Sequence, residues 1–284
     1  MFIGLDLGTS HLKGIVIDDA QNICAEASFP LNVERPKNSW VEQDPNDWIV
    51  ATENVMASLS VQVKLDQVKA IGLSGQMHGA TILDQNGNVL RPCILWNDTR
   101  SFEEASYLDS KAIFRDLTGN IVFPGFTAPK IAWIKKHEPK IFDQISKVLL
   151  PKDYLRFWLS GEYVAEMSDA AGTSWLDVKK RDWSDDLLAA TGLDRSQMPR
   201  LVEGSEISGL LKGKLAAKWG LSGDVIIAGG HNIQCLHYRY ITNTNLPRIN
   251  ASFDMVNAYK VEMKKVKAEQ KLINEISAYQ VRIA

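Results

Sequence analysis

The order of short apolar runs at the start of the chain constrains its fold more than any other feature. Four runs of strand length are present, and a helical segment separates the third from the fourth. The runs are residues 2–6, 12–17, 23–29 and 68–74. Three strands in succession before a helix predict an α/β domain with a mixed sheet, because a simple doubly wound fold alternates strands and helices from its beginning.

The helical segment begins at Asp44-Pro45. Aspartate is a favoured N-cap and proline is favoured at the first helical position, so this pair predicts a helix start. Apolar side chains then recur at a period close to 3.6 and predict one buried face. They are Trp48, Val50, Ala51, Val55, Met56 and Leu59.

Beyond the fourth run the pattern becomes less regular. Residues 80–84 are expected to continue the strand as far as Asn86-Gly87, a strong hairpin turn signal. The long stretch 112–224 is mostly helical in pattern, with breaks at glycine and proline. Residues 225–228 form one more short apolar run and predict another strand.

The composition is that of an ordinary globular protein. The 284 residues are 45% apolar, and a formal net charge of -2 offers no basic field for nucleic acid or a membrane surface. The first residues reach Asp6 without a basic or long apolar segment, so we expect no signal peptide and no membrane span. Cys24, Cys93 and Cys235 fit no metal or disulfide pattern, and a reducing cytoplasm is the expected location.

The segment Asp6-Leu7-Gly8-Thr9-Ser10 follows the first predicted strand. A carboxylate at a strand end, followed by a glycine turn with two hydroxyls, suits magnesium and phosphate because backbone N–H groups can approach phosphate oxygens. The same residues also suit a plain turn without a ligand, and the spacing alone does not separate the two.

The segment from Gly72 to Ala80 combines glycines with polar side chains. Gln76 and His78 offer groups that bond sugar hydroxyls, and Met77 offers apolar contact. The alternative is a strand that crosses a crowded core, with His78 hydrogen-bonded for structural reasons.

Three further segments combine polar side chains with apolar or small residues. In Trp96–Arg100, Asp98 is expected to cap a helix and Arg100 to pair with an acid. Lys130 stands alone among apolar positions, and its simplest role is a lysine near a helix start whose ammonium reaches solvent. Residues 168–173 are expected to form a loop of small residues that permits close packing.

Together and in this order, these motifs resemble the FGGY carbohydrate kinases. The family pattern includes the Asp-Leu-Gly-Thr-Ser start, the segments 40–45 and 95–100, and the signature 125–133 around Lys130. Residues 76–79 and 168–173 are similar to the xylulokinase branch of the family. The resemblance runs from Met1 to about Gly230.

The resemblance implies an actin-like ATPase fold (ribonuclease H-like) in which two domains enclose a cleft. Residues 1–230 would be the N-terminal, sugar-binding domain. Met77 and His78 would contact the ketose D-xylulose, and ATP with Mg would supply the phosphoryl group to give D-xylulose 5-phosphate. The residues implied to face the phosphates and Mg are Asp6, Gly8, Thr9 and Ser10. The resemblance assigns no side chain as a direct metal ligand.

The sequence departs from the family after Gly229-Gly230. An aspartate base is expected there, but His231 and Asn232 occupy the region. Residues 231–284 would form a divergent tail in place of the second ATPase-like domain and its adenine pocket. Within it, 241–250 predicts a linker and 254–284 one amphipathic helix. A histidine can act as a base near neutral pH, but a displacement of about 1 Å costs on the order of 100-fold, so we expect the chain alone to be inactive or strongly impaired.

Three functions remain open from the sequence. The chain is an inactive kinase remnant, or half of a kinase that a separate chain completes, or a non-catalytic sugar-binding or regulatory protein. A frameshift, a gene disruption or a recombination would each explain the tail. We expect a small ketose as the partner and neither nucleic acid nor membrane. A cleft face without its second domain would expose apolar surface and favour self-association.

Overall fold

The computed structural model describes residues 1–228. The linker and amphipathic helix predicted for the tail, together with His231 and Asn232, lie outside the described residues.

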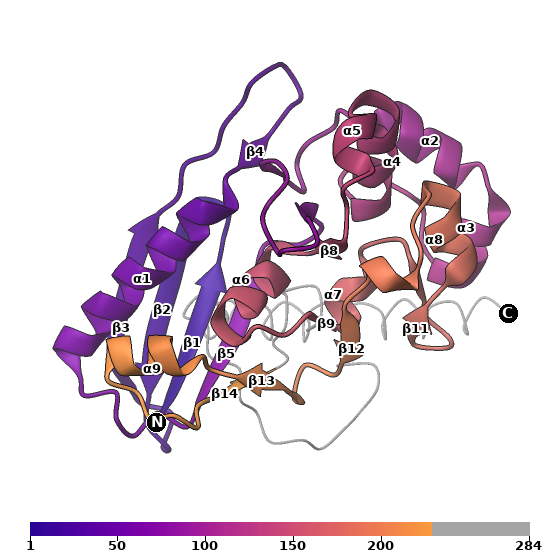
Figure 1. Ribbon diagram of the computed structural model, residues 1–284. Coiled ribbons are helices and arrows are strands. Elements are labelled where there is room, and N and C mark those ends of the chain that lie inside the picture. The colour runs from indigo at the N-terminus through magenta and orange to yellow at the C-terminus, as the bar shows by residue number, and fades with distance from the viewer. Residues whose placement is uncertain (229–284) are drawn as a thin grey trace, which may run out of the picture.

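A six-stranded sheet forms one side of the molecule (Figure 1), in the order β13-β14-β5-β1-β2-β3. Its strands are β1 (Phe2–Leu7), β2 (His11–Ile17), β3 (Ile23–Pro30), β5 (Ala70–Gly75), β13 (Ile207–Leu210) and β14 (Ile226–Ala228). β1 is antiparallel to β2 and parallel to β5, and β14 is also parallel to β5. The mixed sheet predicted from the sequence is therefore confirmed. The carboxyl ends of β1, β5 and β14 meet at one edge of this sheet.

Helix α1 (Pro45–Gln62) packs on β2 and β3. Its N-cap is Asp44, as predicted, and the Asp44 carboxylate accepts the N–H of Asn46. The predicted apolar face is confirmed except at Val50, which is half exposed because it lies about 200° around the helix from Trp48. Thr52 is buried in that face instead, where its hydroxyl donates to the Trp48 carbonyl.

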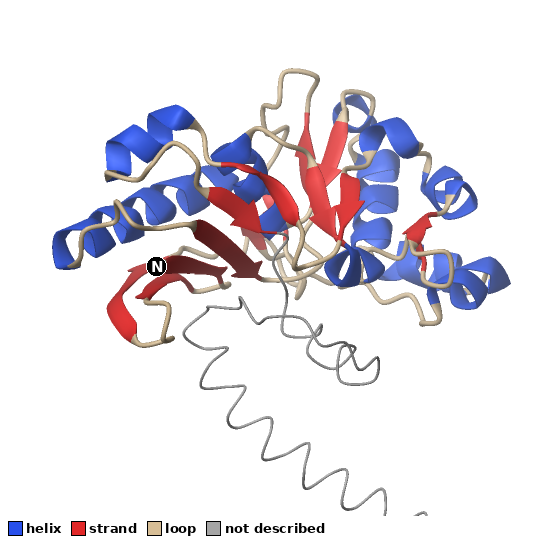
Figure 2. Cartoon of the chain, turned by 90° about the horizontal axis from the view of Figure 1, so that it is seen from below, coloured by secondary structure: helices blue, strands red, loops and turns tan. Residues whose placement is uncertain are grey.

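Two hydrophobic cores lie side by side. The first joins the sheet to α1, α6 (Pro151–Ser160) and α9 (Gly213–Trp219). The second lies among the helices on the other side of the molecule, which Figure 2 shows from below. These helices are α2 (Phe102–Asp109), α3 (Ala112–Thr118), α4 (Thr127–His137), α5 (Pro139–Phe142), α7 (Met167–Ala171), α8 (Asp185–Thr191) and the 3-10 helix η1 (Arg195–Gln197).

Short strands pair in twos outside the main sheet. The pairs are β4 (Glu42–Gln43) with β7 (Cys93–Ile94), β6 (Thr81–Leu83) with β8 (Lys147–Leu149), β9 (Val164–Glu166) with β12 (Arg200–Val202), and β10 (Leu176–Asp177) with β11 (Asp182–Trp183). Residues 112–224 are thus less uniformly helical than predicted. The expectation that 80–84 continues the preceding strand is wrong, because β5 ends at Gly75 and β6 pairs with β8 in a separate sheet.

Candidate functional site

Two turns lie together at the edge of the sheet where β1 and β5 end. Leu7 is the partner of Gly75 in the parallel ladder, and the N–H of Gln76 donates to the Leu7 carbonyl at 2.7 Å. The turn after β1 holds the residues expected to face phosphates, and the turn after β5 holds Met77 and His78. In open α/β sheets, ligands bind in the crevice outside the carboxyl ends of the strands. The structure therefore brings the two predicted groups to one such edge.

The turn between β1 and β2 is tight and is closed by a backbone hydrogen bond. The N–H of Gly8 donates to the His11 carbonyl, and a Cβ on Gly8 would lie only 3.0 Å from that oxygen. Within residues 1–228, the N–H groups of Thr9 and Ser10 meet no acceptor. Asp6 lies on β1, opposite Lys13 of β2. Free N–H groups on a tight turn beside a carboxylate fit the phosphates and Mg of a nucleotide.

His78 occupies a strained turn directly after β5. Its φ is 62°, and the N–H of Gly79 donates to the Met77 carbonyl at 2.8 Å. A hydrogen bond across three residues with positive φ at the centre defines a γ-turn that is rare and strained. For a residue other than glycine such a conformation costs on the order of 1–3 kcal/mol and persists only where the surroundings enforce it.

The His78 imidazole is buried, and its ring makes no hydrogen bond to the part of the chain that the structure describes. It is 5% exposed, and its ring packs edge-on against Phe126 with the ring centroids 4.6 Å apart. Burial, with a smaller contribution from the nearby Lys130 charge, lowers the pKa of His78 to about 3. No side chain or backbone group among residues 1–228 bonds either ring nitrogen of His78, so the alternative of a structurally hydrogen-bonded histidine finds no support there. A neutral imidazole offers one donor and one acceptor to a ligand hydroxyl.

Lys130 is fully buried, and the expectation that its ammonium reaches solvent is wrong. Its Nζ donates to the carbonyls of His78, Gly125 and Phe126. Burial lowers the pKa of Lys130 to about 7. The ionisable groups that face Lys130 are His78, Cys93 of β7, Asp98 and Arg100. Carbonyls from two separate turns thus replace the water that a lysine near a helix start normally meets.

A chain of amide hydrogen bonds connects the two turns. The Gln76 amide donates to Gln43 Oε1 at 2.7 Å, and Gln76 Oε1 accepts the Thr9 hydroxyl. Gln43 also donates to the Thr9 carbonyl and accepts the Trp48 indole N–H. Gln76 therefore uses one donor and one acceptor of its amide within the protein, and its contact with a sugar stays a prediction. Trp96, which is 43% exposed, donates to the Thr9 hydroxyl from the open side.

A buried cluster of charges lies next to the site. Asp169 falls in helix α7, so the expectation of a loop at 168–173 is wrong for its first part. Lys152 is fully buried between Asp153 and Asp169, with Nζ to oxygen distances of 2.9 and 2.8 Å. Arg156 bonds Asp153 and the Ala228 carbonyl and so connects α6 to the end of β14. Sequence reasoning missed Lys152, Asp153 and Arg156, because only their pairing in three dimensions explains why charged residues are buried there.

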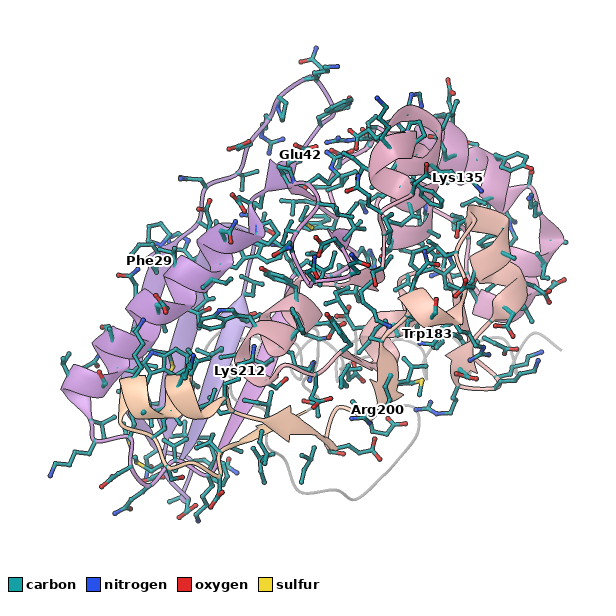
Figure 3. The ribbon with its side chains drawn as sticks, in the orientation of Figure 1. Phe29, Glu42, Lys135, Trp183, Arg200 and Lys212 are labelled. Atoms are coloured by element: carbon teal, nitrogen blue, oxygen red, sulfur yellow. The ribbon has the colours of Figure 1, made fainter. Side chains whose placement is uncertain are left out.

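Asp98 and Arg100 form an ion pair rather than a helix cap. Arg100 donates to both carboxylate oxygens of Asp98, and its guanidinium lies 3.8 Å from the Trp40 ring centroid. The N-cap of α2 is Ser101, so the capping expected of Asp98 is wrong, whereas the acid partner expected for Arg100 is confirmed. Arg100 also pairs with Glu42 of β4, which lies between the α1 side and the α5 side of the molecule (Figure 3).

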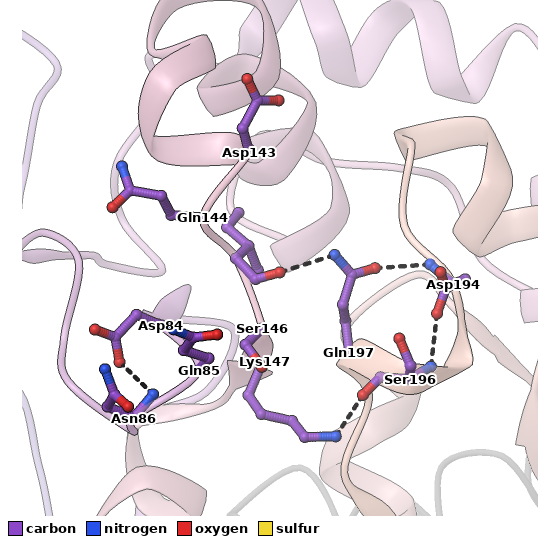
Figure 4. Close-up of a pocket in the computed structure, with 11 residues that line it drawn as sticks. Asp84, Gln85, Asn86, Asp143, Gln144, Ser146, Lys147, Asp194, Ser196 and Gln197 are labelled. Atoms are coloured by element: carbon purple, nitrogen blue, oxygen red, sulfur yellow. Dashed lines mark hydrogen bonds between the residues drawn. The ribbon is translucent and has the colours of Figure 1, made fainter.

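A separate surface pocket of about 660 Å³ lies between the Asp84 turn, β8 and η1 (Figure 4). The carboxylates of Asp84 and Asp194 accept N–H groups of their own turns, and Lys147 bonds the Ser196 carbonyl. None of the residues predicted for the site lines this pocket. The edge where β1 and β5 end is therefore the better candidate site.

Comparison with known proteins places this geometry in a family. The model of the N-terminal domain of the FGGY family of carbohydrate kinases matches residues 1–265. The chain belongs to the FGGY family. This match extends beyond residue 230, where the motifs that were recognised from the sequence end.

Among relatives, the xylulose kinase of Escherichia coli strain K12 is 52% identical over 231 residues, which are 81% of this chain and 48% of that protein. A crystal structure named "xyloylose kinase" from Brucella ovis is 56% identical, with a TM-score of 0.79 over 81% of this chain and 48% of the other. That of the xylulose kinase from Rhodospirillum rubrum is 28% identical, also with a TM-score of 0.79, over 86% and 51%. The chain spans about half the length of the relatives it matches. Within residues 1–228, no helix has the length and apolar character to cross a membrane.

Proposed function

We propose that this chain forms the ketose-binding half of an ATP-dependent sugar kinase whose substrate is D-xylulose. The observation that carries the proposal is the His78 imidazole at the edge where β1 and β5 end, which is buried, neutral and without a hydrogen-bond partner among residues 1–228. The half-buried Met77 beside it offers an apolar contact to the carbon chain of the sugar. High identity to xylulose kinases supports D-xylulose as the ketose.

In the proposed reaction, each described turn has one task. Met77 and His78 would bind and orient the ketose, the N–H groups of Thr9 and Ser10 would bind phosphate oxygens, and Asp6 would face the Mg ion. ATP with Mg supplies the phosphoryl group, and the products are ADP and D-xylulose 5-phosphate. Positioning and charge stabilisation supply most of the catalysis in such transfers. The Gln43–Gln76 hydrogen bonds keep the two turns in register.

A second part of the proposal concerns the catalytic activity of the 284-residue chain by itself. The sequence has His231 and Asn232 where the family has its aspartate base. We therefore propose that the 284-residue chain binds D-xylulose but turns it over poorly or not at all. A sugar-binding or regulatory protein, and a kinase completed by a separate chain, are the alternatives that the test below separates.

Isothermal titration of the purified chain with D-xylulose tests the binding step, and the His78→Asn variant is the control because asparagine tolerates positive φ but lacks the imidazole. Saturable binding that the variant loses supports the proposal, and absence of binding by the unmodified chain overturns it. An ADP-release assay with ATP and Mg tests turnover. Activity well above the blank would refute the proposed impairment. Binding without turnover is the outcome that the proposal expects, and a second chain that restores turnover would identify a split kinase.

A further inference from the structure

The Lys130 ammonium joins the γ-turn at His78 to the start of helix α4. Two of its three acceptors, the carbonyls of Gly125 and Phe126, precede α4, and the third is the His78 carbonyl at 3.2 Å. An ammonium has three N–H donors, so three carbonyls use all of them. The side chain therefore acts as a bridge between two segments that lie far apart in the sequence.

The His78 carbonyl receives a second donor from the same helix start. The hydroxyl of Thr127, itself fully buried, donates to it at 3.1 Å. Two donors on one carbonyl fix the plane of the peptide that follows His78. The positive φ of His78 is unfavourable on its own, so these two hydrogen bonds help to stabilise the γ-turn.

Gly172, after helix α7, restrains the ring of His78. A Cβ on Gly172 would overlap the imidazole, at 2.5 Å from Cδ2. The φ of Gly172 is -75°, which any residue adopts, so its own conformation does not require glycine there. The close approach of the His78 ring does require it. Phe126 meets the ring edge-on and completes the contact.

We propose that Lys130 and Gly172 are positioning residues for the ketose site, Lys130 through the backbone of His78 and Gly172 through its ring. This inference rests on the proposed function, since it assigns to these contacts the task of aiming the imidazole at the sugar. Neither residue touches the ligand in this proposal. Their loss would move or loosen His78, and a misplacement of about 1 Å is enough to cost on the order of 100-fold in a positioned site.

The first test compares D-xylulose affinity with fold stability. Gly172→Ala and Lys130→Met should each weaken D-xylulose binding at least about tenfold, as expected for a displaced contact group. Gly213→Ala is the matched control, because a Cβ at Gly213 meets nothing within 4 Å, and it should leave the dissociation constant unchanged. Urea denaturation of all variants shows whether weaker D-xylulose binding results only from unfolding. Unchanged affinity in folded Gly172→Ala chains would overturn the inference.

A second readout needs no sugar. In chains labelled with ¹³C-histidine, the His78 ring resonance is identified by its absence from His78→Asn. This resonance should shift in Gly172→Ala and in Thr127→Val. Thr127→Val removes one donor to the His78 carbonyl, and it tests the same contact if Lys130→Met does not fold. The resonance should stay in place in Gly213→Ala. A resonance that moves in none of the site variants refutes the positioning roles, whereas failure of the unmodified chain to bind D-xylulose refutes the proposed function alone.

Discussion

Replacing His78 with asparagine tests how a buried neutral imidazole changes the acid sensitivity of the fold. Burial lowers the pKa of His78 from 6.5 to about 3 in the folded chain. Between these two values the unfolded chain binds a proton at this position that the folded chain does not. The free energy of unfolding therefore falls as pH decreases through this window, and the contribution is complete only above the unfolded pKa.

The magnitude follows from linkage. Each pH unit inside the window is worth about 1.4 kcal/mol, so the loss at His78 between pH 7 and pH 5 is about 2 kcal/mol. By pH 4 the loss is about 3 kcal/mol. The free energy of unfolding that is lost by pH 5 depends little on the pKa of His78 in the folded chain, provided that this pKa stays below about 4.

Urea denaturation of the wild-type chain and of His78→Asn at pH 7, 5 and 4 measures this effect. The other histidines are present in both proteins, so their contributions cancel in the comparison. Between pH 7 and pH 5, the free energy of unfolding should fall by about 2 kcal/mol more in the wild-type chain than in the variant, whatever the absolute stability of the variant. Parallel losses in the two proteins would show that His78 is accessible to protons, and the argument for a buried neutral ring would be wrong.

Three further predictions follow from other contacts. D-xylulose affinity should fall several-fold as pH rises from about 6 to about 8.5 in a calorimetric titration, because Lys130, with a pKa of about 7, has only two N–H donors once deprotonated. Gln43→Leu should reduce the free energy of unfolding in urea by about 3 kcal/mol, since it leaves the buried Trp48 indole N–H and other groups unpaired. Gly79→Ala should cost about 1–3 kcal/mol in the same assay, because a Cβ there would lie 2.6 Å from Pro151 Cγ.

Each of these predictions has a direct control. Lys130→Met should have weak affinity that no longer depends on pH, and a pH dependence that survives this change must come from another group. In the same pH range, the lowered pKa of Lys130 makes the fold more stable as pH rises from about 7 toward 10.5, so affinity and stability should move in opposite directions. Gln85→Leu, at an exposed position, and Gly213→Ala, in open space, should each leave the urea midpoint nearly unchanged.

The local signals in the sequence were sufficient for the first part of the fold. The three apolar runs at the start of the chain and the cap at Asp44 depend on neighbours in the chain, and the structure confirms the three strands and the cap. The adjacency of the Asp6 turn and the His78 turn follows once β1 and β5 pair in parallel. Strands such as β10, with two residues, are too short to display a period of two.

The parts that could not be predicted depend on contacts between distant segments. The local sequence around Lys130 does not indicate whether its ammonium reaches solvent or bonds three carbonyls. One of these carbonyls belongs to His78, which lies 52 positions away in the sequence. The γ-turn at His78 likewise has no sufficient local signal, because positive φ is uncommon for any residue other than glycine and the surrounding contacts impose it here. The pairing of Lys152 with Asp169 is similar, since α6 and α7 meet only in the folded chain.

The place of β14 in the sheet has a consequence for how the chain is made. β14 is the last described strand, yet it lies between β5 and β13 and pairs with both. While a ribosome synthesises the chain from its N-terminus, β5 emerges early and keeps an open edge until residues 226–228 follow. Nascent chains would expose this edge to one another throughout that interval, so we expect slow closure of the sheet and a need for chaperone protection during translation.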